Sequence, residues 1–282
     1  MRDVSSAGPR AKCLVLLATY NGERFLDDQI RSIEAQDLST IDILASDDGS
    51  ADGTLQILEG WRERWPKGVF EIAQGPKEGF AGNFRSLALR APFDVDYVAF
   101  SDQDDVWDAD KISTAISRLL EQPAASASLY FSRTRLVDEN GRTIGTSPLF
   151  LRPPSFRNAI VQSIGGGNTV MLNRGGFELF RESARRTGFV THDWWSYLVC
   201  SGAGGTVYYD AKPHISYRQH GANLVGQNTS VSARIDRLVQ LLAGRLSRWT
   251  DTNLEALQAR WDLLSPEAQE AIEALRRVVS IR

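Results

Sequence analysis

Two aspartates spaced two residues apart follow an apolar run in this sequence. Asp102 and Asp104 follow Tyr97–Phe100 after a single serine, and five aspartates lie within residues 100–111. So many carboxylates repel one another unless something positive lies among them. If the run is a buried strand, both side chains could face one pocket and bind a hard cation such as Mg²⁺ or Mn²⁺. The alternative is a solvated surface turn.

The later aspartates of the same stretch have a simpler interpretation. Asp108 and Asp110 precede an apolar-periodic segment, and carboxylates are favoured at helix N-termini. We therefore expect them to cap the following helix. Asp105 is left without an assigned role.

Two further polar clusters follow apolar runs. In Asp47-Asp-Gly-Ser50, Asp48 could accept the imide N–H of a uracil or thymine ring, and the alternative is a turn with a helix cap. In Thr19-Tyr-Asn-Gly-Glu23, Tyr20 offers an aromatic face for a base, or for core packing. The loop Lys77–Phe84, with two glycines and Asn83, has features of a phosphate or ribose cradle but matches no standard phosphate motif.

All three histidines of the chain lie between residues 192 and 220. Asp193 follows the first of them at an expected helix start, where it could act as a general base for a hydroxyl nucleophile or simply favour the helix terminus. His220 ends an expected strand and could complete a metal site begun by Asp104. The alternative is an ordinary surface histidine. His214 follows a proline and is expected to be structural.

The first 120 residues alternate apolar runs with helical periodicity. The sequence predicts strands at 13–18, 41–45, 69–73 and 97–100, separated by helices, and a further helix over about 109–120. This order predicts a parallel α/β sheet, whose ligands bind beyond the carboxyl ends of the strands. The three polar clusters all occupy such ends.

The second half is mixed. We expect a strand at 128–132, a turn between short strands around 137–145, glycines followed by a strand near 165–173, a helix from 191, and paired strands within 206–221. Residues from about 231 onward are expected to be helical. The segment 234–249 has an apolar stripe and four arginines, so it is either a membrane-surface helix or a helix packed on the catalytic domain or a second subunit.

The bulk composition excludes several classes. The chain has 282 residues and a formal net charge of −3, which does not favour a nucleic-acid binder. Its two cysteines form no metal-binding spacing. No apolar run is long enough to span a membrane, and the polar first residues do not read as a signal peptide, so a cytoplasmic protein is expected.

Taken in order and spacing, these motifs resemble the inverting family 2 glycosyltransferases of the GT-A fold. The matching stretches are LLATYNGERFLDDQIRSIEAQ, IDILASDDGSADGT, SDQDDVWDADKI, HDWWSYLV and YRQHGAN. The resemblance is greatest to the bacterial rhamnosyltransferase-like branch that builds O-antigen and other surface polysaccharides. It covers about residues 12–225. We therefore expect a flexible tail at 1–11, a catalytic domain at 12–228 with its halves divided at 122/123, and a helical extension at 229–282.

The resemblance also implies roles for individual residues. Tyr20 and Asp48 would hold the base, Asn83 would lie near the nucleotide, and Asp102 would contact ribose or a metal-bound water. Thr19 and Glu23 complete the expected nucleotide-binding set.

The resemblance implies that Asp104 ligates Mg²⁺ or Mn²⁺ at the diphosphate and that His220 is a further ligand. Asp193 matches the catalytic base. The acceptor wall would be formed by Trp194, Trp195, Gly167 and Asn168, although many relatives carry a cysteine or small polar residue in place of Gly167.

The activity so implied is transfer of one sugar, with L-rhamnose from dTDP-rhamnose as first choice, to a glycan or polyprenyl-diphosphate-linked acceptor. The Q-x-x-R-W signature of processive members is absent. A UDP-sugar donor, a nucleotidyltransferase and a non-catalytic nucleotide-sugar-binding module are the alternatives. Peripheral contact with the inner face of the plasma membrane and a homodimer are also compatible with the sequence.

Overall fold

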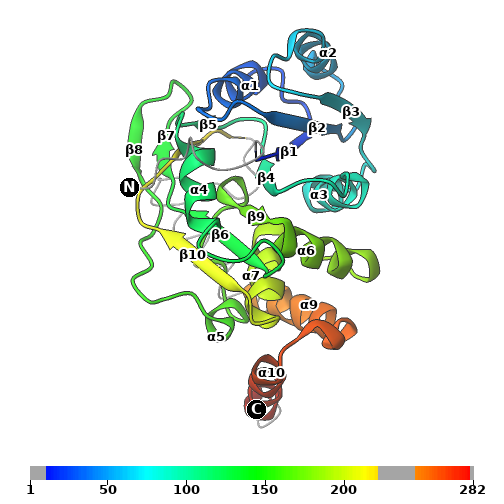
Figure 1. Ribbon diagram of the computed structural model, residues 1–282, viewed down its shortest axis with the longest axis vertical. Coiled ribbons are helices and arrows are strands. Elements are labelled where there is room, and N and C mark those ends of the chain that lie inside the picture. Colours follow the sequence, from blue (N-terminus) through cyan, green and yellow to red (C-terminus); the bar gives the residue numbers. More distant parts are fainter. Residues whose placement is uncertain (1–10, 222–244, 280–282) are drawn as a thin grey trace.

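The computed structural model describes residues 11–221 and 245–279, with the side chains of 248–277 in the second range. These residues form an α/β fold around a seven-stranded sheet of order β10-β6-β9-β4-β1-β2-β3, beside a four-stranded sheet of order β5-β11-β7-β8 (Figure 1). The strands are β1 (Cys13–Thr19), β2 (Ile41–Asp47), β3 (Phe70–Gln74), β4 (Tyr97–Ser101), β5 (Val106–Trp107), β6 (Ser128–Ser132), β7 (Arg135–Val137), β8 (Thr143–Thr146), β9 (Met171–Asn173), β10 (Thr206–Asp210) and β11 (Ile215–Arg218).

The α-helices cover both faces of the large sheet. They are α1 (Leu26–Glu34), α2 (Thr54–Arg64), α3 (Gly79–Arg90), α4 (Lys111–Leu119), α5 (Phe156–Ala159), α6 (Arg174–Arg186), α7 (His192–Gly202), α9 (Arg245–Ala259) and α10 (Pro266–Val279). Short 3₁₀ turns occupy Gly167–Thr169 and Trp261–Leu263.

Strand β1 shows why the sheet lies between two helical layers. Its side chains alternate: Cys13, Val15 and Leu17 belong to the core cluster that includes residues of α1, α2 and α4. Leu14 and Leu16 belong to the larger cluster, which is built with α3, α6 and α7. All are buried, as expected for a strand covered on both faces. Strands β3, β2, β1 and β4 are parallel, which confirms the predicted parallel sheet.

The second half completes both sheets. Antiparallel β9 lies between β4 and β6, so the large sheet is mixed. Strands β7 and β8 form the predicted pair around the Asp138–Arg142 turn. The prediction that residues 206–221 pair with each other is wrong. Strand β10 pairs with β6 in the large sheet, whereas β11 pairs with β5 and β7 in the small one.

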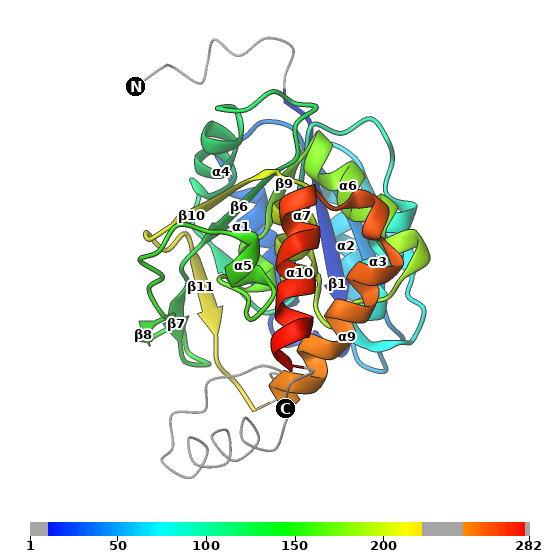
Figure 2. The ribbon, with the colours of Figure 1, turned by 90° about the horizontal axis from the view of Figure 1, so that it is seen from below.

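The C-terminal helices pack on the larger core. Leu257, Leu264 and Ile272 are buried there, and Figures 1 and 2 show α9 and α10 on the side of the sheet that carries α6 and α7. Ser265 accepts a hydrogen bond from Ala268 N at 3.3 Å and so caps α10, whose first residue is Pro266. Most of the 234–249 segment lies outside the described residues, but Trp249 packs partly buried against the core. No helix within the described ranges is long and apolar enough to cross a membrane.

Candidate functional site

The Asp102-Gln-Asp104 stretch begins where buried β4 ends. The Gln103 side chain forms two hydrogen bonds with the backbone of Tyr20 in the loop after β1. Its Oε1 accepts from Tyr20 N at 2.7 Å, and its Nε2 donates to Tyr20 O at 2.9 Å. A Cβ on Gly22 would lie 2.3 Å from Gln103 Oε1, so glycine there permits this arrangement. These two hydrogen bonds join the Thr19–Glu23 loop to the Asp102–Asp104 stretch at the carboxyl ends of β1 and β4.

Asp104 and His220 meet directly. His220 Nε2 lies 2.7 Å from Asp104 Oδ2, and both side chains are largely shielded from solvent. Arg218, two residues before His220, helps to hold this pair in place. Its guanidinium is buried, and its Nε donates to Asp104 O at 3.1 Å. The same guanidinium donates to Glu139 O at 3.0 Å and forms an ion pair with Asp28 at 3.2 Å. Pairing of β11 with β5 thus brings residues over 110 positions apart into one site.

Asp193 lies in the first turn of α7 and belongs to the same electrostatic environment. Burial, followed by the charges of Asp104 and then Asp193, raises the pKa of Asp102 to about 7. The Ser163 hydroxyl donates a hydrogen bond to Asp193 Oδ2 at 3.1 Å and so fixes the position of that carboxylate. Asp102, Asp104 and Asp193 therefore form one group of mutually repelling carboxylates.

The backbone around Asp193 is fixed by a buried aromatic contact. His192 packs against Phe84 and Phe100, with ring centroids 3.9 and 4.8 Å apart. Burial lowers the pKa of His192 to about 4, so the imidazole is neutral at physiological pH. Gly167 lies so close that a Cβ there would be 2.3 Å from the histidine ring. The glycine loop is therefore a wall against which His192, and with it the start of α7, is positioned.

The Asp47-Asp48 pair divides into two structural roles. Asp47 is buried and receives hydrogen bonds from the Thr19 hydroxyl at 3.0 Å and Ser50 N at 2.9 Å, so it closes the turn after β2. Asp48 accepts from Lys77 N at 2.6 Å and Gly79 N at 2.9 Å, which ties β2 to the loop before α3. Carboxylates bound by backbone N–H groups are held in place.

The remaining expected nucleotide residues surround this turn. Tyr20 is 58% exposed, so its ring is available to a base rather than packed in the core. Asn83 is buried and donates to Ser46 O at 2.9 Å, and its Oδ1 has no hydrogen-bond partner within the described residues. Glu23 accepts from Gly53 N at 3.0 Å, which places its carboxylate at the start of α2.

The tryptophans do not fit the expected acceptor wall. Trp195 is fully buried and donates to Ser183 Oγ at 2.8 Å, while Trp194 is 4% exposed and donates to Ala159 O at 2.6 Å. Neither ring is available to a ligand in this conformation. Both instead pack α7 against its neighbours, because an indole combines a large apolar surface with one N–H that needs a partner.

Asn168 is also buried, and its partner is the aspartate that had no role. Asn168 Nδ2 donates to Asp105 Oδ2 at 2.5 Å, and Arg218 N donates to Asp105 Oδ1 at 3.3 Å. Burial, with the nearby charges of Asp104 and Asp102, raises the pKa of Asp105 well above its usual range. Asp105 therefore joins the glycine loop to the end of β11, two residues before His220.

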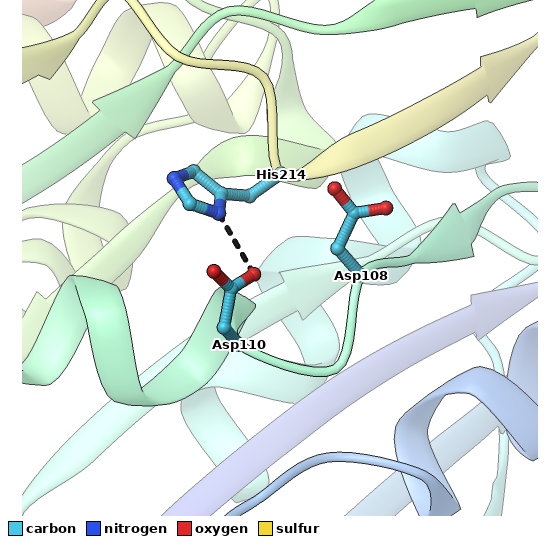
Figure 3. Close-up of side chains that lie close together, drawn as sticks. All are labelled: Asp108, Asp110 and His214. Atoms are coloured by element: carbon cyan, nitrogen blue, oxygen red, sulfur yellow. Dashed lines mark hydrogen bonds and ion pairs between the residues drawn. The ribbon is translucent and has the colours of Figure 1, made fainter.

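A second acidic group lies at the other end of the β5–β11 pair. Ligand atoms of Asp108, Asp110 and His214 all lie within 4.8 Å of one another, a spacing that could hold a metal ion (Figure 3). Both carboxylates already have basic partners: Arg135 reaches Asp108 at 3.1 Å and Lys212 reaches Asp110 at 3.3 Å. Asp110 occupies the N-cap position of α4 but makes no side-chain cap, because it bonds His214 Nδ1 at 3.0 Å. The predicted capping role is wrong.

The positioning residues escaped the sequence interpretation. Gln103 lies between Asp102 and Asp104, and the prediction for this stretch considered only its carboxylates. Arg218 lies two positions before His220, and its burial depends on β11 joining the small sheet. The sequence does contain one indication of their role. Gln103 and Arg218 are hydrogen-bonding residues within stretches whose other polar residues were predicted to bind metal or nucleotide.

Known proteins share sequence and fold with this chain. Residues 14–186 match the model of glycosyl transferase family 2. A dTDP-rhamnosyl transferase, RfbG of Shigella flexneri, is 32% identical over 79% of this chain and 78% of that protein. The Escherichia coli enzyme WfgD, named a UDP-Glc:α-D-GlcNAc-diphosphoundecaprenol β-1,3-glucosyltransferase, is 28% identical over 57% of this chain and 59% of that protein.

Solved structures show the same fold. The Staphylococcus aureus TarS fragment 1-349 in complex with UDP-GlcNAc superposes with a TM-score of 0.57 at 15% identity, over 93% of this chain and 78% of that one. The mannosyltransferase PcManGT of Pyrobaculum calidifontis, in complex with GDP-Man and Mn²⁺, gives a TM-score of 0.54 at 18% identity, over 98% and 82%. The neighbours are GT-A glycosyltransferases, which confirms the expected fold class. By the extent of the family match and the identity to its relative, this chain belongs to glycosyl transferase family 2.

Proposed function

We propose that this glycosyltransferase moves one L-rhamnose unit from dTDP-rhamnose to a glycan or polyprenyl-diphosphate-linked acceptor during cell-surface polysaccharide synthesis. The donor is supported by the identity to a protein named dTDP-rhamnosyl transferase. The acceptor class is supported by the relative whose name specifies a diphosphoundecaprenol substrate. A UDP-sugar is the second candidate donor, since a solved structural neighbour carries UDP-GlcNAc.

The observation that carries the proposal is the convergence of Asp102, Asp104, Asp193 and His220 at the carboxyl ends of β4 and β11 and the start of α7. A carboxylate oxygen and an imidazole nitrogen 2.7 Å apart are suitable ligands for Mg²⁺ or Mn²⁺. Burial, together with the charges of Asp104 and Asp193, raises the pKa of Asp102, and a cation would offset this excess of negative charge. We therefore assign Asp104 and His220 as its ligands. When bound, such a cation neutralises charge on the leaving nucleoside diphosphate.

The chain's own residues provide the remaining chemistry. Asp193 accepts the proton of an acceptor hydroxyl, whose oxygen attacks the anomeric carbon of the donor. The bond from that carbon to the diphosphate oxygen breaks at the same time, so one displacement inverts the anomeric centre. Ser163 holds the Asp193 carboxylate in place through its hydrogen bond of 3.1 Å. Tyr20, Asp48 and Asn83 line the side on which the nucleotide binds, with Thr19 and Glu23 supporting the turns around it.

The acceptor enters beside the glycine loop. Gly167 and Asn168 shape this loop rather than contact the sugar: one accommodates His192, and the other holds Asp105. A lipid-linked acceptor would bring the protein to the inner face of the plasma membrane.

A binding screen tests donor and cation together. Thermal unfolding is measured with dTDP, UDP and GDP and their sugars, each with Mn²⁺ or with EDTA. A ligand at 100 times its Kd stabilises the protein by about 2.7 kcal/mol, so the preferred base is distinguishable. We expect dTDP-rhamnose with Mn²⁺ to give the largest shift and to be consumed in a transfer assay. Equal shifts for all nucleotides, or shifts unaffected by EDTA, would contradict the assignment.

A further inference from the structure

The loop between β8 and α5 carries exposed leucines and partly buried aromatic rings. Phe150 packs edge-on against Tyr209, with centroids 5.7 Å apart, and Phe150 N donates to the Tyr209 hydroxyl at 3.4 Å. Its neighbours Leu149 and Leu151 are 46% and 85% exposed. Phe150 is thus anchored on Tyr209, while the leucines on either side of it in the chain are presented to solvent.

This loop is anchored firmly enough to present the leucines as a fixed surface. Phe156, at the start of α5, packs partly buried against the larger core. Ser155 N donates to the Tyr197 hydroxyl of α7 at 2.8 Å, and Arg133 donates to Ser147 O at 3.0 Å. Exposed leucines on an anchored loop are an exception to the burial of large apolar side chains and indicate a binding surface.

The charge along the segment that carries the leucines has one sign. No aspartate or glutamate occurs from Gly141 to Phe177, in a chain that has 35 acidic residues in total. Arg152 and Arg157 are exposed in the same segment, and neither forms an ion pair within the described residues. Exposed leucines beside unpaired arginines match a surface that is apolar inside and negatively charged at its boundary.

The surface borders the catalytic base. Val161, a third exposed apolar residue, is 46% exposed and precedes Ser163 by two positions. Ser163 is the residue that donates to Asp193. Two residues of chain span at most about 7 Å, so the apolar surface reaches close to the point where an acceptor hydroxyl meets Asp193.

We propose that Leu149, Leu151, Arg152 and Arg157 form a docking surface for an anionic lipid bilayer. We refer to these four residues as the leucine–arginine surface. The inference rests on the lipid-linked acceptor of the proposed function, because a bilayer at this position presents such an acceptor to Asp193. The leucines enter the interface between headgroups and acyl chains, and the arginines pair with lipid phosphates. The positive charge favours anionic lipid over a second copy of this chain, which would bring like charges together.

Vesicle binding tests the surface. The full chain is sedimented with phosphatidylcholine vesicles, with and without phosphatidylglycerol. We expect binding only to the anionic vesicles. Arg152→Gln with Arg157→Gln should weaken it roughly 25-fold, at about fivefold for each arginine near a charged surface. Leu149→Ser with Leu151→Ser should weaken it at least as strongly. The matched control is Val69→Ser with Arg118→Gln: Val69 is 53% exposed beside β3, the opposite edge strand of the large sheet. It should bind like the wild type.

Transfer assays separate this inference from the proposed function. The variants should transfer sugar normally to a water-soluble acceptor and poorly to the same acceptor embedded in anionic vesicles. Equal vesicle binding by the wild type and both surface variants would overturn the inference. So would a wild type that binds no vesicles but forms a dimer that the leucine variant abolishes. Loss of all transfer by the wild type, with vesicle binding and its dependence on the surface retained, would refute the proposed function while supporting the docking surface.

Discussion

Alanine at Gly167 tests whether the glycine loop positions the start of α7. An added Cβ would lie 2.3 Å from both Cε1 and Nε2 of His192, well inside contact distance. The imidazole cannot move aside easily, because it is 3% exposed and packs against Phe84 and Phe100. Overpacking of this kind costs about 1–3 kcal/mol. Because Asp193 follows His192 directly, the sugar-transfer rate should fall while dTDP affinity is retained.

A double-mutant cycle measures the contact itself. The free energy of unfolding is determined in urea for Gly167→Ala, His192→Ala and the combination. His192→Ala leaves a cavity that accepts the new methyl group, so Gly167→Ala should cost almost nothing in that background. The coupling free energy should therefore be about 1–3 kcal/mol.

Two results would refute this reasoning. Independent sites add within about 0.5 kcal/mol, so additive effects would mean that the glycine and the histidine do not meet. Gly188→Ala is the matched control, since its Cβ would have nothing within 4 Å. If that change destabilised the protein as much as Gly167→Ala, the cost would reflect glycine loss alone.

Three further predictions concern pH, the arginine support and the metal. The pKa of a histidine in the unfolded chain is near 6.5, whereas burial lowers the pKa of His192 in the folded protein to about 4. The unfolded state therefore takes up a proton first as the pH falls. The free energy of unfolding of the wild type, measured in urea, should fall by about 3 kcal/mol relative to His192→Gln between pH 7.5 and 4. Arg218→Met should cost about 2–4 kcal/mol in urea unfolding and weaken Mn²⁺-dependent dTDP binding, because Asp104 O and Glu139 O lose their buried donor; normal values for both would contradict the supporting role. Asp104→Asn should abolish the difference between Mn²⁺ and EDTA in the dTDP thermal shift, and a retained difference would assign the metal elsewhere.

The parallel half of the fold follows from local patterns. Continuous apolar strands separated by amphipathic helices can pack only with both sheet faces covered, and the carboxyl ends then share one edge. That is why Asp102, Asp104 and Asp48 could be placed from the sequence. Strand pairing in the second half depends instead on contacts between distant residues. The separation of β10 from β11, and the approach of His220 to Asp104, are set by this long-range pairing.

The sequence also does not distinguish residues that bind a ligand from residues that hold the site in place. Trp195, Asn168 and Gln103 are residue types that often bind ligands, yet each is turned toward the protein. Only their partners distinguish the roles: Ser183 for the indole, Asp105 for the amide, and the Tyr20 backbone for the glutamine. Asp105 shows the reverse case, since it had no assigned role and proves to connect two parts of the site.

The most direct test of the central claim compares binding and transfer in Asp193→Ala. Asp193 is the proposed base for the acceptor hydroxyl but is no proposed ligand of nucleotide or metal. The variant should bind dTDP with Mn²⁺ like the wild type, while its kcat for transfer falls about 10²–10⁴-fold, the usual contribution of a general base. Transfer at the wild-type rate would contradict the account, because Asp193 would then not be the base.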